Sequence, residues 1–200
     1  MSESATAGAD WMRGTRRSAV QDRILEIAGA VFGDRGPDAS MSQIAAAVGC
    51  SRATLYRYFD GRRRLQVAYV DRVARRISAA VAADVVVEDP GERFTESVLT
   101  ALEHVRAEPA LAAWFVPRGA GVASELALSS ELIERAAVAL LGDESSAPAD
   151  GDRLDAARWV VRVIVSLLAV PGGTPAQERA TIARFVAPVV VGRRGLADTR

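Results

Sequence analysis

The sequence predicts an all-α fold built from successive amphipathic helices. Apolar residues recur at three- and four-residue spacing along most of the chain. Pro, Gly and Ser residues separate these periodic segments, and no segment alternates like a half-buried strand, because Val85-Val86-Val87 is too short to count. At 200 residues and 50% hydrophobic content, the chain is long enough to bury a sizeable core.

The N-terminal residues differ in character from the segment that follows them. Residues 1–15 are small and polar without apolar periodicity, which predicts a flexible arm. Apolar residues then recur on one helical face and predict a first helix over residues 18–33, which ends at Gly33 or at the Gly36-Pro37 pair.

Two short helices joined by a tight turn are predicted next. Ser40 and Gln43 have the Ser-x-x-Gln spacing of a capping box, which places a helix start at Ser40. Gly49 suits the left-handed conformation in which a helix can end. Ser51 can cap a second helix over residues 52–59. Two helices of this length around a Gly-containing turn form a helix-turn-helix.

The rest of the chain is predicted to be helical, with polar breaks. A long helix over residues 62–83 would link two domains. Five further helices are expected at residues 93–107, 109–115, 123–141, 152–170 and 175–190. The polar segment 142–151 predicts a mobile loop, and residues 193–200 predict a disordered tail.

The charges are distributed unevenly, although the formal net charge is zero. Residues 1–83 carry 13 Arg against 8 acidic residues, whereas residues 84–200 carry 12 Arg against 17 acidic residues. A basic front half suits a polyanionic partner.

The second helix of the helix-turn-helix carries the candidate DNA contacts. Leu55 and Phe59 can face the first helix, while Arg52 and Arg57 are candidate base readers because a guanidinium pairs bidentately with guanine. Taken singly, these side chains could equally pack or lie on a solvated face. The candidate DNA-binding residues are Arg17, Ser42, Ser51, Arg52, Ala53, Thr54, Tyr56, Arg57, Tyr58 and Arg62.

The segment from Ile44 to Leu65 closely resembles the DNA-binding domain of the TetR family of repressors. The resemblance covers residues 18–70 and is most specific over Thr54–Phe59; Cys50 stands where Val is common, and Arg62 where Lys is typical. It implies a three-helix DNA-binding domain at residues 16–62. It also implies a helical ligand-binding and dimerisation domain at residues 63–192, with dimerisation through the last two long helices.

The C-terminal domain offers candidate residues for an apolar ligand pocket. Aromatic and aliphatic side chains on the central helices could line a cavity, and His104 and Arg118 could supply polar contacts. A filled core is the alternative reading of the same residues. The candidate ligand-binding residues are Phe94, Leu102, His104, Trp114, Phe115, Arg118, Leu126 and Trp159.

The helices at residues 152–170 and 175–190 are the candidates for a dimer interface. Their apolar residues exceed one buried stripe, so they need a second surface, which a two-fold partner would provide. Two core helices within one subunit are the alternative. The candidate interface residues are Trp159, Val163, Leu167, Ile182, Phe185 and Val189.

The competing protein classes find little support. One His and one Cys argue against a metal site, no cofactor is expected, and no phosphate-binding loop or nucleophile elbow indicates an enzyme. Arg158 and Arg162 interrupt the most apolar run, so no membrane span is expected. The absence of a signal-peptide pattern and the single Cys favour a cytoplasmic location.

The sequence therefore predicts a transcriptional regulator, a homodimer on double-stranded operator DNA that a small apolar effector releases. A helix-turn-helix protein without an effector is the alternative.

Overall fold

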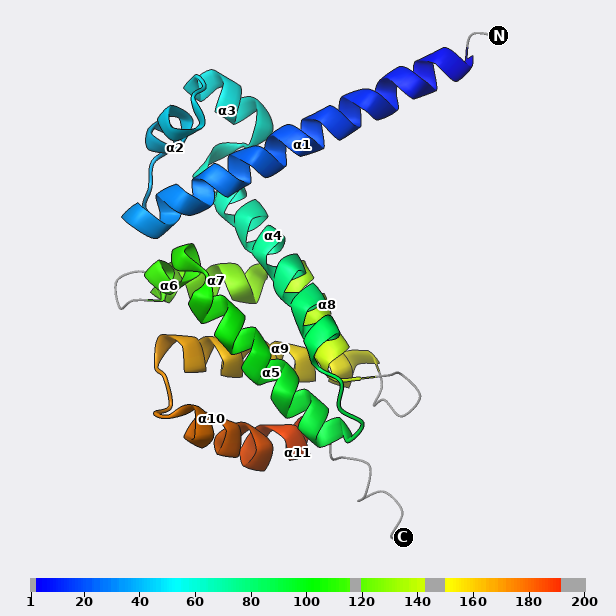
Figure 1. Cartoon of the computed structure of the whole chain (residues 1–200), viewed down its shortest axis with the longest axis vertical. Coiled ribbons are helices and arrows are strands. Elements are labelled where there is room, and N and C mark those ends of the chain that lie inside the picture. The colour runs from blue at the N-terminus through cyan, green and yellow to red at the C-terminus, as the bar shows by residue number, and fades with distance from the viewer. Residues whose placement is uncertain (1–2, 116–119, 143–149, 192–200) are drawn as a thin grey trace.

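The computed structural model describes residues 3–115, 120–142 and 150–191, with side chains from Arg17 onward in the first helix (Figure 1). Within these ranges every regular element is a helix, as the sequence predicts. The elements are α1 (Glu3–Arg35), α2 (Met41–Val48), α3 (Arg52–Tyr58), α4 (Gly61–Asp84), α5 (Pro90–Ala107), α6 (Pro109–Trp114), α7 (Ala120–Ser129), α8 (Glu131–Leu140), α9 (Asp150–Ala169), α10 (Pro175–Thr181), the π-helical segment η2 (Ile182–Val186) and α11 (Ala187–Val190).

The molecule has a small head and a larger body, which α4 connects. Figure 1 shows α2 and α3 beside α1 at one end of the molecule, and α5 to α11 gathered at the other end. One core cluster nevertheless runs from Phe32 of α1 and Leu55 of α3 to Trp114 of α6 and Leu126 of α7. Head and body therefore share buried side chains and are not separated by a linker.

The predicted caps of the helix-turn-helix are confirmed. The backbone N–H of Gln43 donates to Ser40 Oγ at 3.2 Å, and the N–H of Ser40 donates to Gln43 Oε1 at 2.8 Å. Gly49 ends α2 with a φ of 77°, a conformation that costs glycine little because it has no Cβ. Ser51 Oγ accepts the N–H of Thr54 at 3.0 Å and begins α3.

The N-terminal segment differs from the sequence prediction. Residues 3–15, expected as a flexible arm, continue α1, which projects away from the head (Figure 1). Once residues 18–35 are packed, each added helical residue gains a hydrogen bond without a new nucleation cost, and no proline interrupts the segment. The helix also passes Gly33 and ends at Gly36, whose φ is 74°.

The prediction of a single helix over residues 123–141 is wrong, because the structure divides this segment into α7 and α8 at Ser130. Ser130 Oγ accepts the N–H of Ile133 at 3.2 Å and donates to Asp71 Oδ1 on α4 at 2.9 Å. The contact with Asp71 is tertiary, so local periodicity gave no sign of it.

The last predicted helix, over residues 175–190, is also interrupted. Its central turn, η2, has π-helical bonding, and the N–H of Ala187 donates to the carbonyl of Ile182, five residues earlier. Pro188 has no N–H to donate and crowds the carbonyl four residues before it, which explains a local change of bonding pattern. The loop and tail predictions at residues 143–149 and 193–200 lie outside the described residues.

Candidate DNA interface and body cavity

The exposed face of α3 is held in place by its own buried side. Leu55 is fully buried and Phe59 nearly so, and both pack with Ile44 of α2 in the core that also contains α1. Tyr56, next to Leu55 in the helix, is 44% exposed. The prediction that Leu55 and Phe59 point inward is therefore confirmed. Arg52, Ala53, Tyr56 and Arg57 are exposed, and Thr54 and Tyr58 are half-buried.

The two candidate base readers lie on this exposed face without acidic partners. Arg52 and Arg57 are exposed, and among the described residues neither forms an ion pair. The guanidinium of Arg52 lies 5.9 Å from the ring centre of Tyr56, within reach of a cation–π contact. Ala53 is exposed on the same helix, and Ser42 is exposed on α2.

Arg17 connects α1 to the end of α3. Its Nη2 donates to the carbonyl of Arg57 at 3.2 Å, and its guanidinium lies 5.8 Å from the ring centre of the half-buried Tyr58. Arg17 thus lies beside the other candidate DNA contacts, although it is forty residues away in sequence.

Three candidates already have partners within the head. The hydroxyls of Ser51 and Thr54 lie 2.9 Å apart, and both act at the N-terminus of α3. Arg62 donates to the carbonyl of Asp38 at 3.2 Å and lies 3.6 Å from its carboxylate. The structure therefore gives these side chains a role in shaping the turn and the α1–α2 connection.

A cavity of about 320 Å³ lies in the body between α4, α5, α6, α7, α8 and α9. Its wall is mostly aliphatic, and its polar side chains are Ser78, Arg93 and Ser97, with the indole of Trp114. Trp114 is fully buried, and its Nε1 has no hydrogen-bond partner in the described structure.

The predicted pocket residues divide into three groups. Trp114 and Phe115 line the cavity. Phe94, Leu102 and Leu126 are instead buried in the core clusters and do not line the cavity. Arg118 lies outside the described residues.

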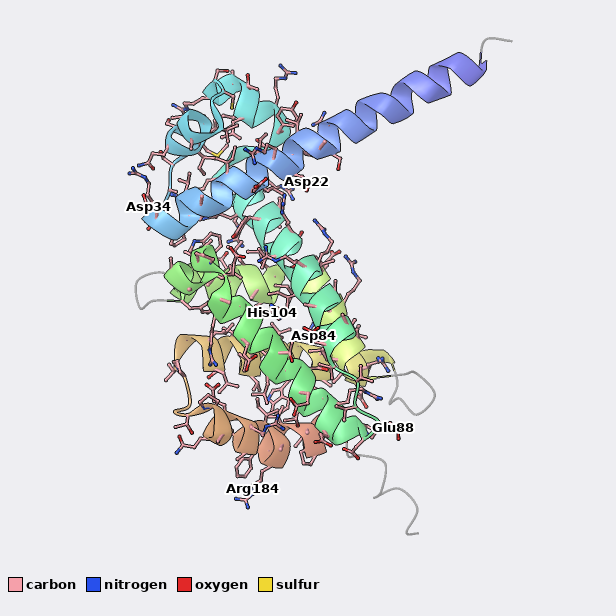
Figure 2. All side chains as sticks on the ribbon, in the orientation of Figure 1. Asp22, Asp34, Asp84, Glu88, His104 and Arg184 are labelled. Atoms are coloured by element: carbon pink, nitrogen blue, oxygen red, sulfur yellow. The ribbon has the colours of Figure 1, made fainter. Side chains whose placement is uncertain are left out.

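The remaining two predicted pocket residues, His104 and Trp159, lie on the surface and not at the cavity. His104 Nε2 is 3.9 Å from Oδ2 of Asp84 at the end of α4, and Figure 2 shows His104 and Asp84 on neighbouring helices. Sequence reasoning missed the wall formed by α4, α8 and α9, because it sought aromatic residues. The available signal for this wall was a run of small side chains in the sequence, Ala136-Ala137-Val138-Ala139.

The junction between head and body lies against this cavity. The rings of Phe32, Tyr69 and Trp114, from α1, α4 and α6, have centres 5.1 to 6.0 Å apart. The Tyr69 hydroxyl donates to Glu108 Oε1 at 2.7 Å, and Arg76 pairs with the same carboxylate. One cavity-lining ring therefore touches the first helix of the head directly.

The candidate dimer face is partly exposed. Phe185 and Val189 are 64% and 56% exposed, and Trp159 is also exposed, whereas Val163 and Leu167 are half-buried. Ile182 is fully buried among side chains of α5 and α9, so its prediction as an interface residue is wrong. On a regular α-helical wheel Ile182 shares a face with Phe185 and Val189, which is why the sequence grouped them. The π-helical turn η2 changes that register in the structure.

Comparison with known proteins identifies the family. A model of the bacterial regulatory proteins of the tetR family matches residues 24–69, the segment from α1 to the start of α4. The uncharacterized HTH-type transcriptional regulator Rv1255c of Mycobacterium tuberculosis is 47% identical over 189 residues, which is 92% of each chain. This chain belongs to the TetR family of transcriptional regulators.

Solved TetR-family structures share the fold over most of the chain. The repressor QsdR of R. erythropolis has a TM-score of 0.64 at 20% identity, covering 88% of this chain and 95% of its own. The repressor AlkX of Dietzia sp. has a TM-score of 0.63 at 20% identity, covering 85% and 94%. RolR in complex with resorcinol has a TM-score of 0.64 at 17% identity, covering 88% and 89%.

As a TetR-family protein, the chain is a DNA-binding transcriptional regulator and not an enzyme. The described helices include none long and apolar enough to cross a membrane. In the described ranges, no three His, Cys, Asp or Glu side chains gather where they could hold a metal ion.

Proposed function

We propose that this TetR-family regulator is a cytoplasmic repressor, a homodimer that binds a palindromic operator and leaves it when a small molecule occupies the body cavity. The observation that carries the proposal is the contact between the two sites. Trp114 lines the cavity and packs against Phe32 of α1, so a molecule in the cavity adjoins a side chain that supports the head.

The ligand acts by favouring one arrangement of the heads. It can shift the equilibrium only by the difference between its affinities for the two arrangements. Helix α4 is suited to transmit the change, since Leu65 at its start packs in the head core and Ile77 and Val81 further along line the cavity. A helix-turn-helix protein without an effector has no use for this cavity, which favours the ligand-responsive function.

Operator binding requires two heads at a fixed spacing. In a helix-turn-helix dimer, the recognition helices enter successive major grooves about 34 to 36 Å apart, or a multiple of that distance. Helix α3 is the recognition helix here, with Arg52 and Arg57 as base readers and Arg17, Ser42, Tyr56 and Tyr58 as phosphate or groove contacts. Binding weakens steeply as salt rises, because phosphate contacts release counterions.

The test begins with the purified full-length protein and fragmented genomic DNA of its source organism. At low salt, the protein enriches a fragment in which footprinting reveals a palindromic protected site. Arg52→Ala and Tyr56→Ala each weaken binding to that site, and loss of one bidentate base contact costs about 1–3 kcal/mol, or about 5- to 150-fold. Fluorescence anisotropy with the labelled site measures the affinities.

Arg75→Ala provides the matched control. Arg75 is an exposed arginine on α4, outside the helix-turn-helix, and it forms no ion pair among the described residues. The control keeps the wild-type affinity within about twofold, since the lost charge is remote from α3. If no fragment is enriched at low salt, or if all three variants bind equally, the assignment of α3 as the reading helix is wrong.

A further inference from the structure

We propose that the cavity binds a carboxylate with an elongated hydrocarbon chain, and that the guanidinium of Arg93 pairs with its carboxylate group. The inference rests on the proposed function, because it names the effector class of the same cavity. It replaces the apolar effector that the sequence predicts with an anionic, amphipathic one.

The lining residues give the cavity an elongated shape. On α5 they are Arg93, Ser97, Ala101 and Val105, at every fourth position, so they form one stripe along the helix. Twelve residues of helix span about 18 Å. On α4, lining residues extend from Val70 to Ala82. Two helices therefore contribute stripes of this length to the same wall, and a chain-like molecule fits between them.

Arg93 lies at one end of this stripe as a cation that lacks an acidic partner. It is partly buried, and among the described residues its side chain forms no ion pair or hydrogen bond. Its Nη2 lies against the turn at Gly142, 3.3 Å from where a Cβ added to that glycine would stand. Arg106, on the same helix, is instead paired with Glu178.

An unpaired charge that is partly removed from water is costly, and a carboxylate compensates it through two parallel hydrogen bonds. Ser97, one turn further along α5, is buried and lines the same stripe, so its hydroxyl can donate to the same carboxylate. The site thus offers a cation and a neutral donor within one helical turn.

The rest of the wall excludes a cationic ligand. It contains no Asp or Glu, so an ammonium group has no counterion there. Beyond Ser97, the stripe of α5 is aliphatic, and α8 and α9 add side chains such as Ala137 and Val165, which suit a hydrocarbon chain. At the far end, the indole N–H of Trp114 is buried and has no partner among the described residues.

The volume limits the length of the chain. At about 30 Å³ for each water-sized group, a cavity of about 320 Å³ holds on the order of ten to twelve non-hydrogen atoms. Decanoate has this size and shape, and serves as the probe. 1-Decanol is a neutral molecule of the same chain length, and decylammonium is the corresponding cation.

Isothermal titration calorimetry with the full-length protein tests the proposal. Decanoate binds with one site for each chain, and on the order of tenfold more tightly than 1-decanol or decylammonium, since a charge-assisted hydrogen bond distinguishes it. Arg93→Met weakens decanoate binding by about tenfold or more and leaves 1-decanol within about twofold. Arg75→Met, which removes an exposed arginine of α4 outside the lining, changes neither.

Thermal melting first establishes that each variant folds. Should Arg93→Met fail to fold, Arg93→Lys keeps the charge, and the proposal requires this variant to prefer decanoate to 1-decanol. The proposal is overturned if 1-decanol or decylammonium binds the wild type as tightly as decanoate, if Arg93→Met weakens decanoate and 1-decanol equally, or if none of the three probes binds.

A parallel anisotropy measurement separates this inference from the proposed function. If decanoate binds through Arg93 but leaves the operator complex intact, the release mechanism is wrong while the carboxylate site stands. If decanoate does not bind although another small molecule releases the operator, the repressor function stands and the carboxylate assignment fails.

Discussion

Tyr69 is the residue at which head, body and cavity wall meet. Its ring packs against Phe32 and Trp114, and its hydroxyl donates to Glu108. Burial, to which the hydrogen bond with Glu108 adds, raises the pKa of the Tyr69 hydroxyl above its ordinary value. The hydroxyl therefore stays protonated and remains a donor at neutral pH.

Tyr69→Phe keeps the ring contacts and removes the hydrogen bond. Because the acceptor is a mostly buried carboxylate, we expect the free energy of unfolding to fall by about 1.5–3 kcal/mol. Urea denaturation measures the change. The same variant weakens the effect of a cavity ligand on operator affinity, since α4 loses a link to the α5–α6 turn. An unchanged stability and an unchanged ligand effect would show that the hydroxyl has neither role.

Gly29 of α1 is the second residue at the junction of head and body that a substitution can test, because an added Cβ would meet the Tyr69 ring. A Cβ on Gly29 would lie 2.7 Å from the ring of Tyr69, too close for the ring to stay where it is. We expect Gly29→Ala to lower the free energy of unfolding by about 1–3 kcal/mol, as overpacking does. Gly121→Ala on α7 is the control, because its Cβ meets open space and alanine favours a helix. Equal melting temperatures for the two variants would contradict the overpacking argument.

At the scale of elements, α10 is held to the body by one buried carboxylate. Glu178 accepts two hydrogen bonds from Arg106 on α5, at 2.7 and 2.8 Å, and one from the N–H of Gly172 at 3.1 Å. These donors, Arg106 foremost, hold the pKa of Glu178 below its ordinary value. The loop before α10, the helix itself and α5 are thereby joined at one side chain.

The stability that Glu178 contributes depends on pH in a defined direction. A carboxylate with a lowered pKa in the folded state stabilises it fully above the unfolded value of about 4.3, and this contribution is lost as the pH falls through the folded value. Since Arg106 is partly exposed, we expect Glu178→Gln to cost about 1–2 kcal/mol at pH 7. Urea midpoints for wild type and variant converge as the pH falls below 4. A constant difference at all pH values would show that the charge of Glu178 is irrelevant.

At the scale of the whole molecule, exposed apolar side chains on the last helices predict the dimer. Phe185 and Val189, four residues apart, are largely exposed, and Arg184 beside them points away from the body (Figure 2). Large exposed apolar groups that point the same way mark an interaction surface. Two-fold symmetry would place two such surfaces face to face.

Phe185→Glu is expected to convert the dimer to a monomer at micromolar concentration, because two-fold symmetry would bring two carboxylates into one apolar interface. Light scattering after size-exclusion chromatography measures the mass. Arg184→Glu is the matched control, since its side chain already faces water and its substitution leaves the dimer intact. A dimeric Phe185→Glu protein would place the interface elsewhere.

The head could be predicted from the sequence because its signals are local. The capping box at Ser40, the left-handed Gly49 and the cap at Ser51 each depend on residues within four positions, and backbone hydrogen bonding fixes their outcome. The inward orientation of Leu55 and Phe59 follows from the helical repeat. The TetR-family match covers this same region.

The body was decided by tertiary contacts that no local pattern contains. The division of α7 from α8 depends on the hydrogen bond between Ser130 and Asp71, fifty-nine residues apart. The burial of Ile182 depends on which side of η2 meets α5 and α9. The cavity depends on how far small side chains hold neighbouring helices apart. The sequence therefore suggested Phe94 and Leu126 as lining residues, whereas both are buried in the core and the wall is mostly aliphatic.

The sequence by itself therefore determined the fold class, the helix-turn-helix and the family, because helical periodicity and capping are properties of neighbouring residues. Only the tertiary structure decided where the cavity lies and that Arg93 faces it without a partner among the described residues. The physical reason is that a cavity and an unpaired charge are defined by what surrounds a side chain, and those surroundings come from helices far apart in the chain.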